Sequence, residues 1–115
     1  MNCTIYHNPR CSKSRQTLSL LEAKKLDIDI VLYLENTPGK SQIKTLLKQL
    51  NMTARELLRK NEDAYKEAGL ADASLSESAI IDAMVTYPKL IERPIVVCGD
   101  KAVIGRPPER IEELF

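Results

Sequence analysis

Hydrophobic and polar residues in the first third of the chain follow two different periods. Residues 3–6 form a short apolar, β-prone run, which ends at the structure-breaking segment His7-Asn8-Pro9. From Cys11 to Lys25 the apolar positions recur at helical spacing and predict a helix that begins near Cys11. Residues 28–35 alternate with a period of two and predict a second strand. The helix face consists of Ser14, Leu18, Leu21 and Lys25, and the better-buried strand face consists of Ile28, Ile30, Leu32 and Leu34. Strand, helix and strand over about 35 residues form a βαβ unit.

The middle of the chain is predicted to be mostly helical. Apolar residues recur at helical spacing over 43–50. Thr53 and Glu56 then match a capping box, which predicts a helix that carries residues 57–59. Ser76 is a predicted N-cap for a later helix, which ends before the next proline.

The last quarter of the chain predicts an antiparallel hairpin and a final helix. Residues 95–98 and 102–104 are apolar runs around a glycine-containing turn, and the two prolines of 107–109 suit the first turn of a helix. The order β-α-β, several helices, β-β, α is the plan of the thioredoxin-like fold. We therefore expect an α/β protein with a mixed four-stranded sheet. It is expected to form a single domain over residues 1–115, with a helical insertion at about 38–88.

Composition and charge exclude some classes of function. The chain has 115 residues, of which 43% are hydrophobic and 29% are charged, an ordinary globular mixture. Its 17 basic and 16 acidic residues leave a net charge of +1, which supplies no long-range field for a polyanion. We therefore expect no nucleic-acid binding and no attachment to an acidic membrane.

The three cysteines are few and odd in number, which argues against a disulfide scaffold. No signal peptide or membrane-spanning apolar run is recognisable, so we expect a cytoplasmic protein whose thiols stay reduced. A single histidine and widely separated cysteines also lack the spacing of a zinc site. We expect no bound metal.

Cys11 is the residue with the most evident chemical potential. It falls where a strand ends and a helix begins, and there the free amides and the helix dipole stabilise a thiolate. The cations near it in sequence are Arg10, Lys13 and Arg15. With the hydroxyls of Ser12 and Ser14, the same loop suits an oxyanion that the thiolate could attack. The alternative is that Cys11 fills the first turn as a small apolar residue and that the serines are helix-start residues.

His7 and the Arg93-Pro94 pair are further candidates. His7 lies four residues before Cys11 and is the only histidine. It either tunes the thiolate or serves as a structural hydrogen-bonding residue. A thioredoxin-like fold places a cis proline at the start of the strand over 95–98, so we predict a cis bond before Pro94. Arg106 precedes Pro107 just after the hairpin, and Arg59 follows the apolar pair Leu57-Leu58. Each could be an ordinary solvated arginine, which is the commoner case for an exposed arginine.

Four separated segments together resemble the glutaredoxin-coupled arsenate reductases across the whole chain. They are Ile5-Tyr6-His7-Asn8-Pro9-Arg10-Cys11, Leu57-Leu58-Arg59-Lys60-Asn61, Arg93-Pro94-Ile95-Val96-Val97 and Arg106-Pro107. The resemblance implies a thioredoxin-like domain and a reduction of arsenate to arsenite. The implied roles are Cys11 as nucleophile, His7 and Ser14 as residues that keep it ionised, and Arg59, Arg93 and Arg106 as ligands of the arsenate oxygens.

The resemblance also implies the partners. Glutathione would be the co-substrate, glutaredoxin would resolve the mixed disulfide that forms on the enzyme, and no cofactor would be bound. We expect a monomer. Two alternatives stay open: a glutathione-dependent thiol oxidoreductase with another substrate, and an RNA-polymerase-binding redox regulator of the same fold. The regulators use a Cys-x-x-Cys pair, and Ser14 occupies the second position here.

Overall fold

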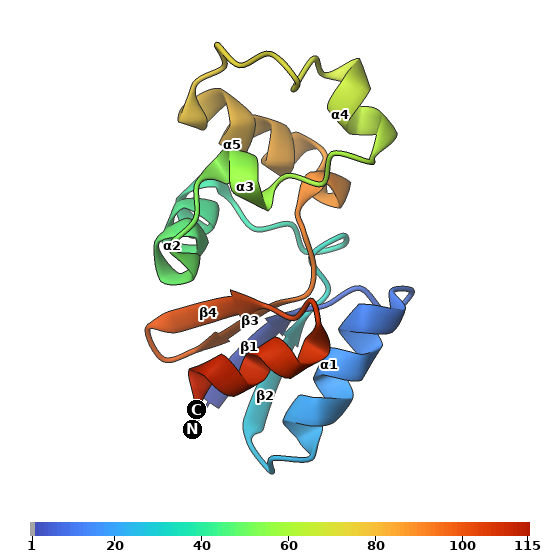
Figure 1. Cartoon of the computed structure of the whole chain (residues 1–115), viewed down its shortest axis with the longest axis vertical. Helices are drawn as coiled ribbons and strands as arrows, with labels where there is room; N and C mark the ends of the chain where they lie inside the picture. The colour runs from blue at the N-terminus through green and yellow to red at the C-terminus, as the bar shows by residue number, and fades with distance from the viewer. Residues whose placement is uncertain (1) are drawn as a thin grey trace. The chain divides into compact units, whose positions relative to one another are not determined.

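A computed structural model describes residues 2–115 and divides the chain into two compact units. One unit comprises the residues up to Asn36 together with Arg93–Phe115, and the other is Thr37–Glu92. Figure 1 shows a sheet with helices in the first unit and only helices in the second. We refer to them as the sheet unit and the helical unit.

The sheet unit contains a mixed four-stranded sheet within the described residues. Its strands are β1 (Asn2–Tyr6), β2 (Asp27–Val31), β3 (Ile95–Cys98) and β4 (Lys101–Ile104), arranged in the order β2-β1-β3-β4. β1 and β2 are parallel, whereas β3 is antiparallel to both β1 and β4. The predicted βαβ unit, hairpin and α/β class are therefore confirmed.

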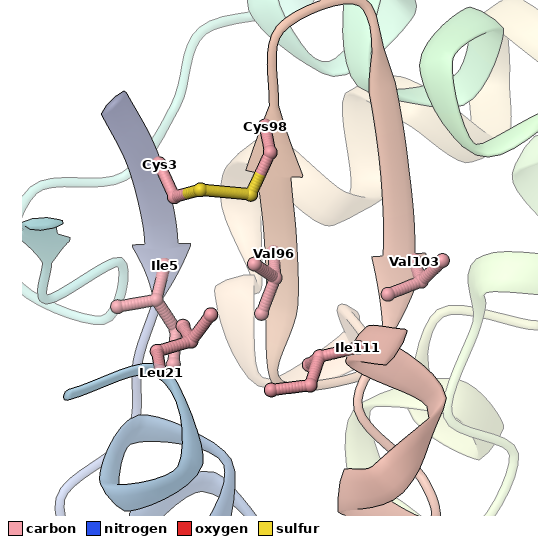
Figure 2. Close-up of a cluster of buried hydrophobic side chains, with 7 residues drawn as sticks. All are labelled: Cys3, Ile5, Leu21, Val96, Cys98, Val103 and Ile111. Carbon is pink, nitrogen blue, oxygen red and sulfur yellow. A yellow bond between two sulfur atoms is a disulfide. The ribbon is translucent and has the colours of Figure 1, made fainter. Parts of the chain in front are cut away.

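Two helices of the sheet unit pack against each other and build its core. They are α1 (Ser12–Glu22) and η2 (Pro108–Leu114), and Figure 1 shows them side by side next to the sheet. Figure 2 shows core side chains from the strands and from both helices. They are Ile5, Val96 and Val103 of the strands, Leu21 of α1 and Ile111 of η2. The predicted final helix is thus present, but it is a 3₁₀ helix.

The burial predicted for the second strand is wrong at Ile30 and Leu34, whereas Ile28 of the same face packs against the core. β2 ends at Val31, and the side chains of Ile30 and Leu34 are 50% and 36% exposed. Tyr33, which the alternation placed on the opposite face, is 2% exposed. The physical reason is the position of β2 at the edge of the sheet, where it pairs only with β1 and its side chains meet fewer neighbours.

Cys3 and Cys98 form a disulfide between β1 and β3, so the argument against disulfides from the cysteine count is wrong for this pair. Figure 2 shows the bond crossing between the two strands. The two residues are register partners, and their Cα atoms lie 4.4 Å apart, a separation typical of directly opposed antiparallel residues. Residues 95 positions apart become neighbours only through the sheet, which the count of cysteines does not reveal.

The helical unit confirms the predicted caps. Its elements are α2 (Lys40–Leu50), α3 (Ala54–Leu57), α4 (Asp63–Glu67), α5 (Glu77–Thr86) and η1 (Pro88–Leu90). The Glu56 N–H donates to Thr53 Oγ1 at 3.2 Å and the Thr53 N–H donates to Glu56 Oε1 at 2.9 Å, a complete capping box. The hydroxyl oxygen of Ser76 accepts from the backbone N–H of Ala79. These side chains accept hydrogen bonds from backbone N–H groups that have no partner within the helix.

One prediction for the helical unit is wrong. α3 ends at Leu57, so the predicted helix does not extend over residues 57–59. Leu58 is instead extended and forms an isolated antiparallel bridge with Ile91. The bridge makes the backbone bonds that a further helical turn would have made.

The helical unit includes the segment 38–88 that the sequence suggested as an insertion. That the whole chain forms a single domain stays a prediction. Among residues 2–115, no helix combines the length and the apolar character needed to cross a membrane. The expected cytoplasmic location stays a prediction.

Removal of the disulfide is expected to destabilise the sheet unit. The Cys3→Ala/Cys98→Ala variant should lose about 2–4 kcal/mol of unfolding free energy, because a long closed loop no longer restricts the unfolded chain. Urea denaturation measures this loss, and Cys11→Ser, which leaves the disulfide intact, is the matched control. Titration of the protein unfolded in urea without a reductant should find one thiol, and three thiols would contradict the pairing.

Candidate functional site

Strand register brings three separate segments to one end of the sheet. Tyr6 at the end of β1 is the partner of Ile95, and Ile95 is the partner of Ile104 at the end of β4. The loop after Tyr6, the residues just before Ile95 and those just after Ile104 must therefore lie next to one another. These segments contain Cys11, Arg93 and Arg106 in that order.

Cys11 is the N-cap of α1, as the sequence predicted. Its N–H donates to the carbonyl oxygen of Asn8 at 3.0 Å, and its own carbonyl oxygen accepts from the N–H of Arg15 at 3.0 Å. The Arg15 guanidinium also donates to the Pro9 carbonyl oxygen at 2.8 Å. The loop is thus fastened to the helix that follows it. Cys11 is partly exposed and is the only free cysteine among residues 2–115.

Arg106 places a cation beside the Cys11 sulfur. Its Nη1 atom donates to Cys11 Sγ at 3.8 Å and to the carbonyl oxygen of Arg93 at 3.2 Å. A guanidinium beside the sulfur can hold an oxyanion next to the atom that would attack it. The Nε and Nη1 atoms of Arg93 are buried. Two of the three predicted arginines therefore belong to the end of the sheet that holds Cys11.

Arg59 belongs to the helical unit. Its Nη1 atom lies 3.0 Å from Glu62 Oε1, its Nε atom lies 3.5 Å from Glu92 Oε1, and its N–H donates to the Leu90 carbonyl oxygen. The two carboxylates hold the guanidinium in place within that unit. That Arg59 reaches the site of Cys11 stays a prediction.

His7 and Ser14 form a buried pair beneath the loop. His7 Nδ1 and Ser14 Oγ lie 2.6 Å apart, and the Ser14 oxygen also accepts from the Asn8 N–H at 3.1 Å. Both side chains are almost fully buried, at 6% and 0% exposed. Burial lowers the pKa of His7, and the nearby Arg15 cation lowers it further. The structure therefore pairs these two predicted residues with each other and with the backbone of the loop.

The bond before Pro94 is cis, as predicted, and the bond between Arg106 and Pro107 is cis as well. Sequence analysis missed the second of these. Both bonds belong to the segments that flank the same end of the sheet.

Thr17 and Gly105 make a close contact that sequence analysis also missed. The Thr17 hydroxyl donates to the Lys13 carbonyl oxygen at 2.8 Å and lies 3.3 Å from the Gly105 carbonyl oxygen. A Cβ atom at Gly105 would lie 2.5 Å from Thr17 Oγ1 and 3.0 Å from Pro94 Cγ. Thr17 is fully buried on the same side of α1 as Ser14 and Leu21, and that three- and four-residue spacing is the signal that could have found it.

Residues 2–115 contain no group of three or more His, Cys, Asp or Glu side chains that could hold a metal ion. The polar groups gathered at the site are a thiol, an imidazole, hydroxyls and guanidinium groups. Such a set suits the binding of an oxyanion and an attack by sulfur.

Comparison with known proteins decides the family. The ArsC family profile matches residues 6–114. The chain belongs to the ArsC family. Its fold is accordingly the thioredoxin-like α/β fold predicted from the order of its elements, and the predicted resemblance is confirmed.

Relatives align with the chain over nearly its whole length. It is 59% identical over 111 residues to the Uncharacterized protein YfgD of Escherichia coli (strain K12), covering 96% of this chain and 93% of that protein. It is 45% identical over 112 residues to an arsenate reductase of Neisseria meningitidis serogroup A, covering 96% of each. The solved structure of an arsenate reductase from Vibrio cholerae has a TM-score of 0.97 at 47% identity and covers 100% of this chain and 98% of that chain.

Gly105→Ala should destabilise the sheet unit, because the added methyl group overlaps Thr17 and Pro94. We expect a loss of about 1–3 kcal/mol in unfolding free energy, measured by urea denaturation. Gly39→Ala is the matched control, since a Cβ there meets nothing within 4 Å. The Thr17→Ala background removes the two closest overlapping atoms, those of Thr17, and should reduce the cost of Gly105→Ala; equal costs in both backgrounds would contradict this explanation.

Protonation of His7 should weaken the fold. Its pKa lies below the ordinary value of 6.5 in the folded protein, so the unfolded chain binds the proton first as pH falls. The unfolding free energy should therefore decrease below about pH 6.5, with a slope of at most about 1.4 kcal/mol per pH unit from this group. Urea denaturation between about pH 7.5 and 5.5 measures it, and His7→Gln should lack this part of the slope. Parallel curves for the two proteins would refute the assignment.

Proposed function

We propose that this chain is an arsenate reductase that uses Cys11 as its nucleophile. The observation that carries the proposal is the contact of Arg106 with the Cys11 sulfur at the start of α1. It combines a free thiol with a cation and with helix amides that attract an anion. Relatives aligned over almost the whole chain are arsenate reductases, which supports the same substrate here.

The first step is attack of the Cys11 thiolate on arsenic(V). A sulfur–arsenic bond forms, and an arsenic–oxygen bond breaks as water or hydroxide leaves. Arg93 and Arg106 would hold the arsenate oxygens, and Arg59 would join them from the helical unit. Arginine suits this task because its planar guanidinium donates two parallel hydrogen bonds to an oxyanion and keeps its charge.

The second step needs another thiol, which we assign to glutathione. Cys3 and Cys98 are joined to each other and lie at the far end of β1, about three residues or roughly 10 Å from the end that carries the site. The glutathione thiolate attacks the Cys11 sulfur, and the electron pair of the sulfur–arsenic bond passes to arsenic. Arsenic(V) is thereby reduced to arsenic(III), while two thiols are oxidised to one mixed disulfide. Glutaredoxin then restores the Cys11 thiol by disulfide exchange.

His7 and Ser14 would act through the loop that precedes Cys11. Ser14 Oγ accepts a hydrogen bond from the Asn8 N–H, and the Asn8 carbonyl oxygen accepts one from the Cys11 N–H. Because both side chains are buried, the pair keeps the loop in one conformation and so positions the sulfur at the helix start. This is a positioning role, consistent with the hydrogen bonds of both residues.

The replacement Cys11→Ser tests the nucleophile. Arsenite formation from arsenate, with glutathione and glutaredoxin supplied, should fall to the background rate because a serine hydroxyl is far less acidic than a thiol. Arsenic speciation by chromatography measures the product. The Cys3→Ala/Cys98→Ala variant makes its changes outside the site and should keep its turnover below its melting temperature. Unchanged turnover in Cys11→Ser would refute the mechanism.

Lysine variants in the same assay separate the arginines. Arg59→Lys, Arg93→Lys and Arg106→Lys keep the charge but lose the paired hydrogen bonds, so kcat/KM for arsenate should fall about 10- to 100-fold. Arg110→Lys is the matched control, because Arg110 is exposed on η2 and pairs with Glu113. A fall for Arg110→Lys as large as for the other three would show that the effect is not specific to the site.

A further inference from the structure

A pocket opens on the sheet unit beside the loop that leads to Cys11. Its volume is about 290 Å³. One wall is the loop from His7 to Arg10, and the other is formed by Leu32, Leu34 and Glu35, which follow β2. The mechanism above assigns no role to this pocket.

The pocket presents one charge of each sign. Arg10 and Glu35 both line it and are both exposed. Within residues 2–115 neither side chain makes an ion pair or a side-chain hydrogen bond; only the backbone N–H groups of these two residues are bonded, to Asn8 and Leu32. Arg10 and Glu35 thus border the same space, and their charges do not neutralise each other in an ion pair. A ligand that carries a carboxylate and an ammonium group on one carbon complements both charges.

Next to Glu35, the wall that follows β2 is apolar. Leu34 is 36% exposed, one of the larger apolar side chains on the surface, and Leu32 is partly buried beside it. These side chains offer contacts to methylene groups between the two ends of a ligand. A volume at the low end of known ligand pockets fits part of a small peptide and not a protein domain.

Glutathione has the required chemistry. Its glutamate is linked through the side-chain carboxyl group, so the α-carboxylate and the α-ammonium are both free at the end far from the thiol, with two methylenes in between. We propose that the pocket between Arg10 and Glu35 binds the γ-glutamyl end of glutathione, so that its thiol reaches Cys11. This inference rests on the proposed function, because that function is what requires an external thiol.

A reaction without arsenate tests the pocket independently. The Cys11 thiolate attacks one sulfur of glutathione disulfide, the sulfur–sulfur bond breaks, a new one joins Cys11 to one glutathione, and the other leaves as a thiolate. Intact-protein mass spectrometry gives the rate. The rate with glutathione disulfide is divided by the rate with bis(2-hydroxyethyl) disulfide, which lacks both charges. The division cancels any change in the reactivity of the Cys11 thiolate itself. This ratio is the selectivity for glutathione.

Arg10→Gln and Glu35→Gln should each lower the selectivity roughly two- to fivefold, the usual effect of one exposed charge pair. Glu35→Gln is the decisive variant. Glutathione disulfide is a net anion, so attraction at long range alone would make this variant faster. Lys13→Gln is the matched control, because Lys13 also lies near Cys11 in sequence but does not line the pocket.

The outcomes separate this inference from the proposed function. Lower selectivity in both pocket variants, with Lys13→Gln within about twofold of the unmodified protein, supports the pocket even if no arsenite forms. In steady-state arsenate reduction, the pocket variants should raise KM for glutathione and leave KM for arsenate unchanged. A rise in selectivity for Glu35→Gln, or an equal loss for Lys13→Gln, overturns the pocket while arsenate reduction could still stand.

Discussion

The pairing of β3 with both β1 and β4 is the constraint on which the site of this protein depends. It sets Tyr6, Ile95 and Ile104 in one row across the sheet. Each of these residues borders a segment that carries a functional group, so one row of hydrogen-bonded strands brings together residues about 95 positions apart. Without that row, Arg106 would have no fixed relation to the Cys11 sulfur.

Buried polar contacts then hold the helix of Cys11 against that row. Thr17 joins α1 to Gly105, and the missing side chain at Gly105 allows the approach. His7 and Ser14 bond to each other, and Ser14 bonds to the backbone of the loop. A buried hydroxyl or imidazole without a partner destabilises a fold, so these groups favour one arrangement of the loop over its alternatives. The thiol is thereby presented at the helix start while the groups around it stay in place.

The three sulfur atoms divide between structure and chemistry. Two are joined across the sheet and buried, and the third stays free and partly exposed beside an arginine. A chain with one free thiol can form a bond to arsenic. It has no second free thiol that could attack the bound sulfur and release the arsenic as arsenic(III). This asymmetry gives the proposed role of glutathione its physical basis, and it directs attention to the pocket between Arg10 and Glu35.

The sequence by itself determined the features that depend on near neighbours. The hairpin over 95–104, the capping box of Thr53 and Glu56 and the helix start at Cys11 follow from local propensities and spacing, and all three are present. Together with the order of the elements, they were sufficient to predict the fold class and to select Cys11, whereas Arg93 and Arg106 were selected through the resemblance of four segments to a known family.

Only the tertiary structure decided the features that depend on long-range packing. The edge position of β2 exposes Ile30, the register of β1 with β3 joins Cys3 to Cys98, and the approach of two backbones makes Gly105 necessary. Periodicity describes which residues share a face but not what covers that face. Such contacts form between segments that are far apart in the chain, so no local pattern of residues encodes them.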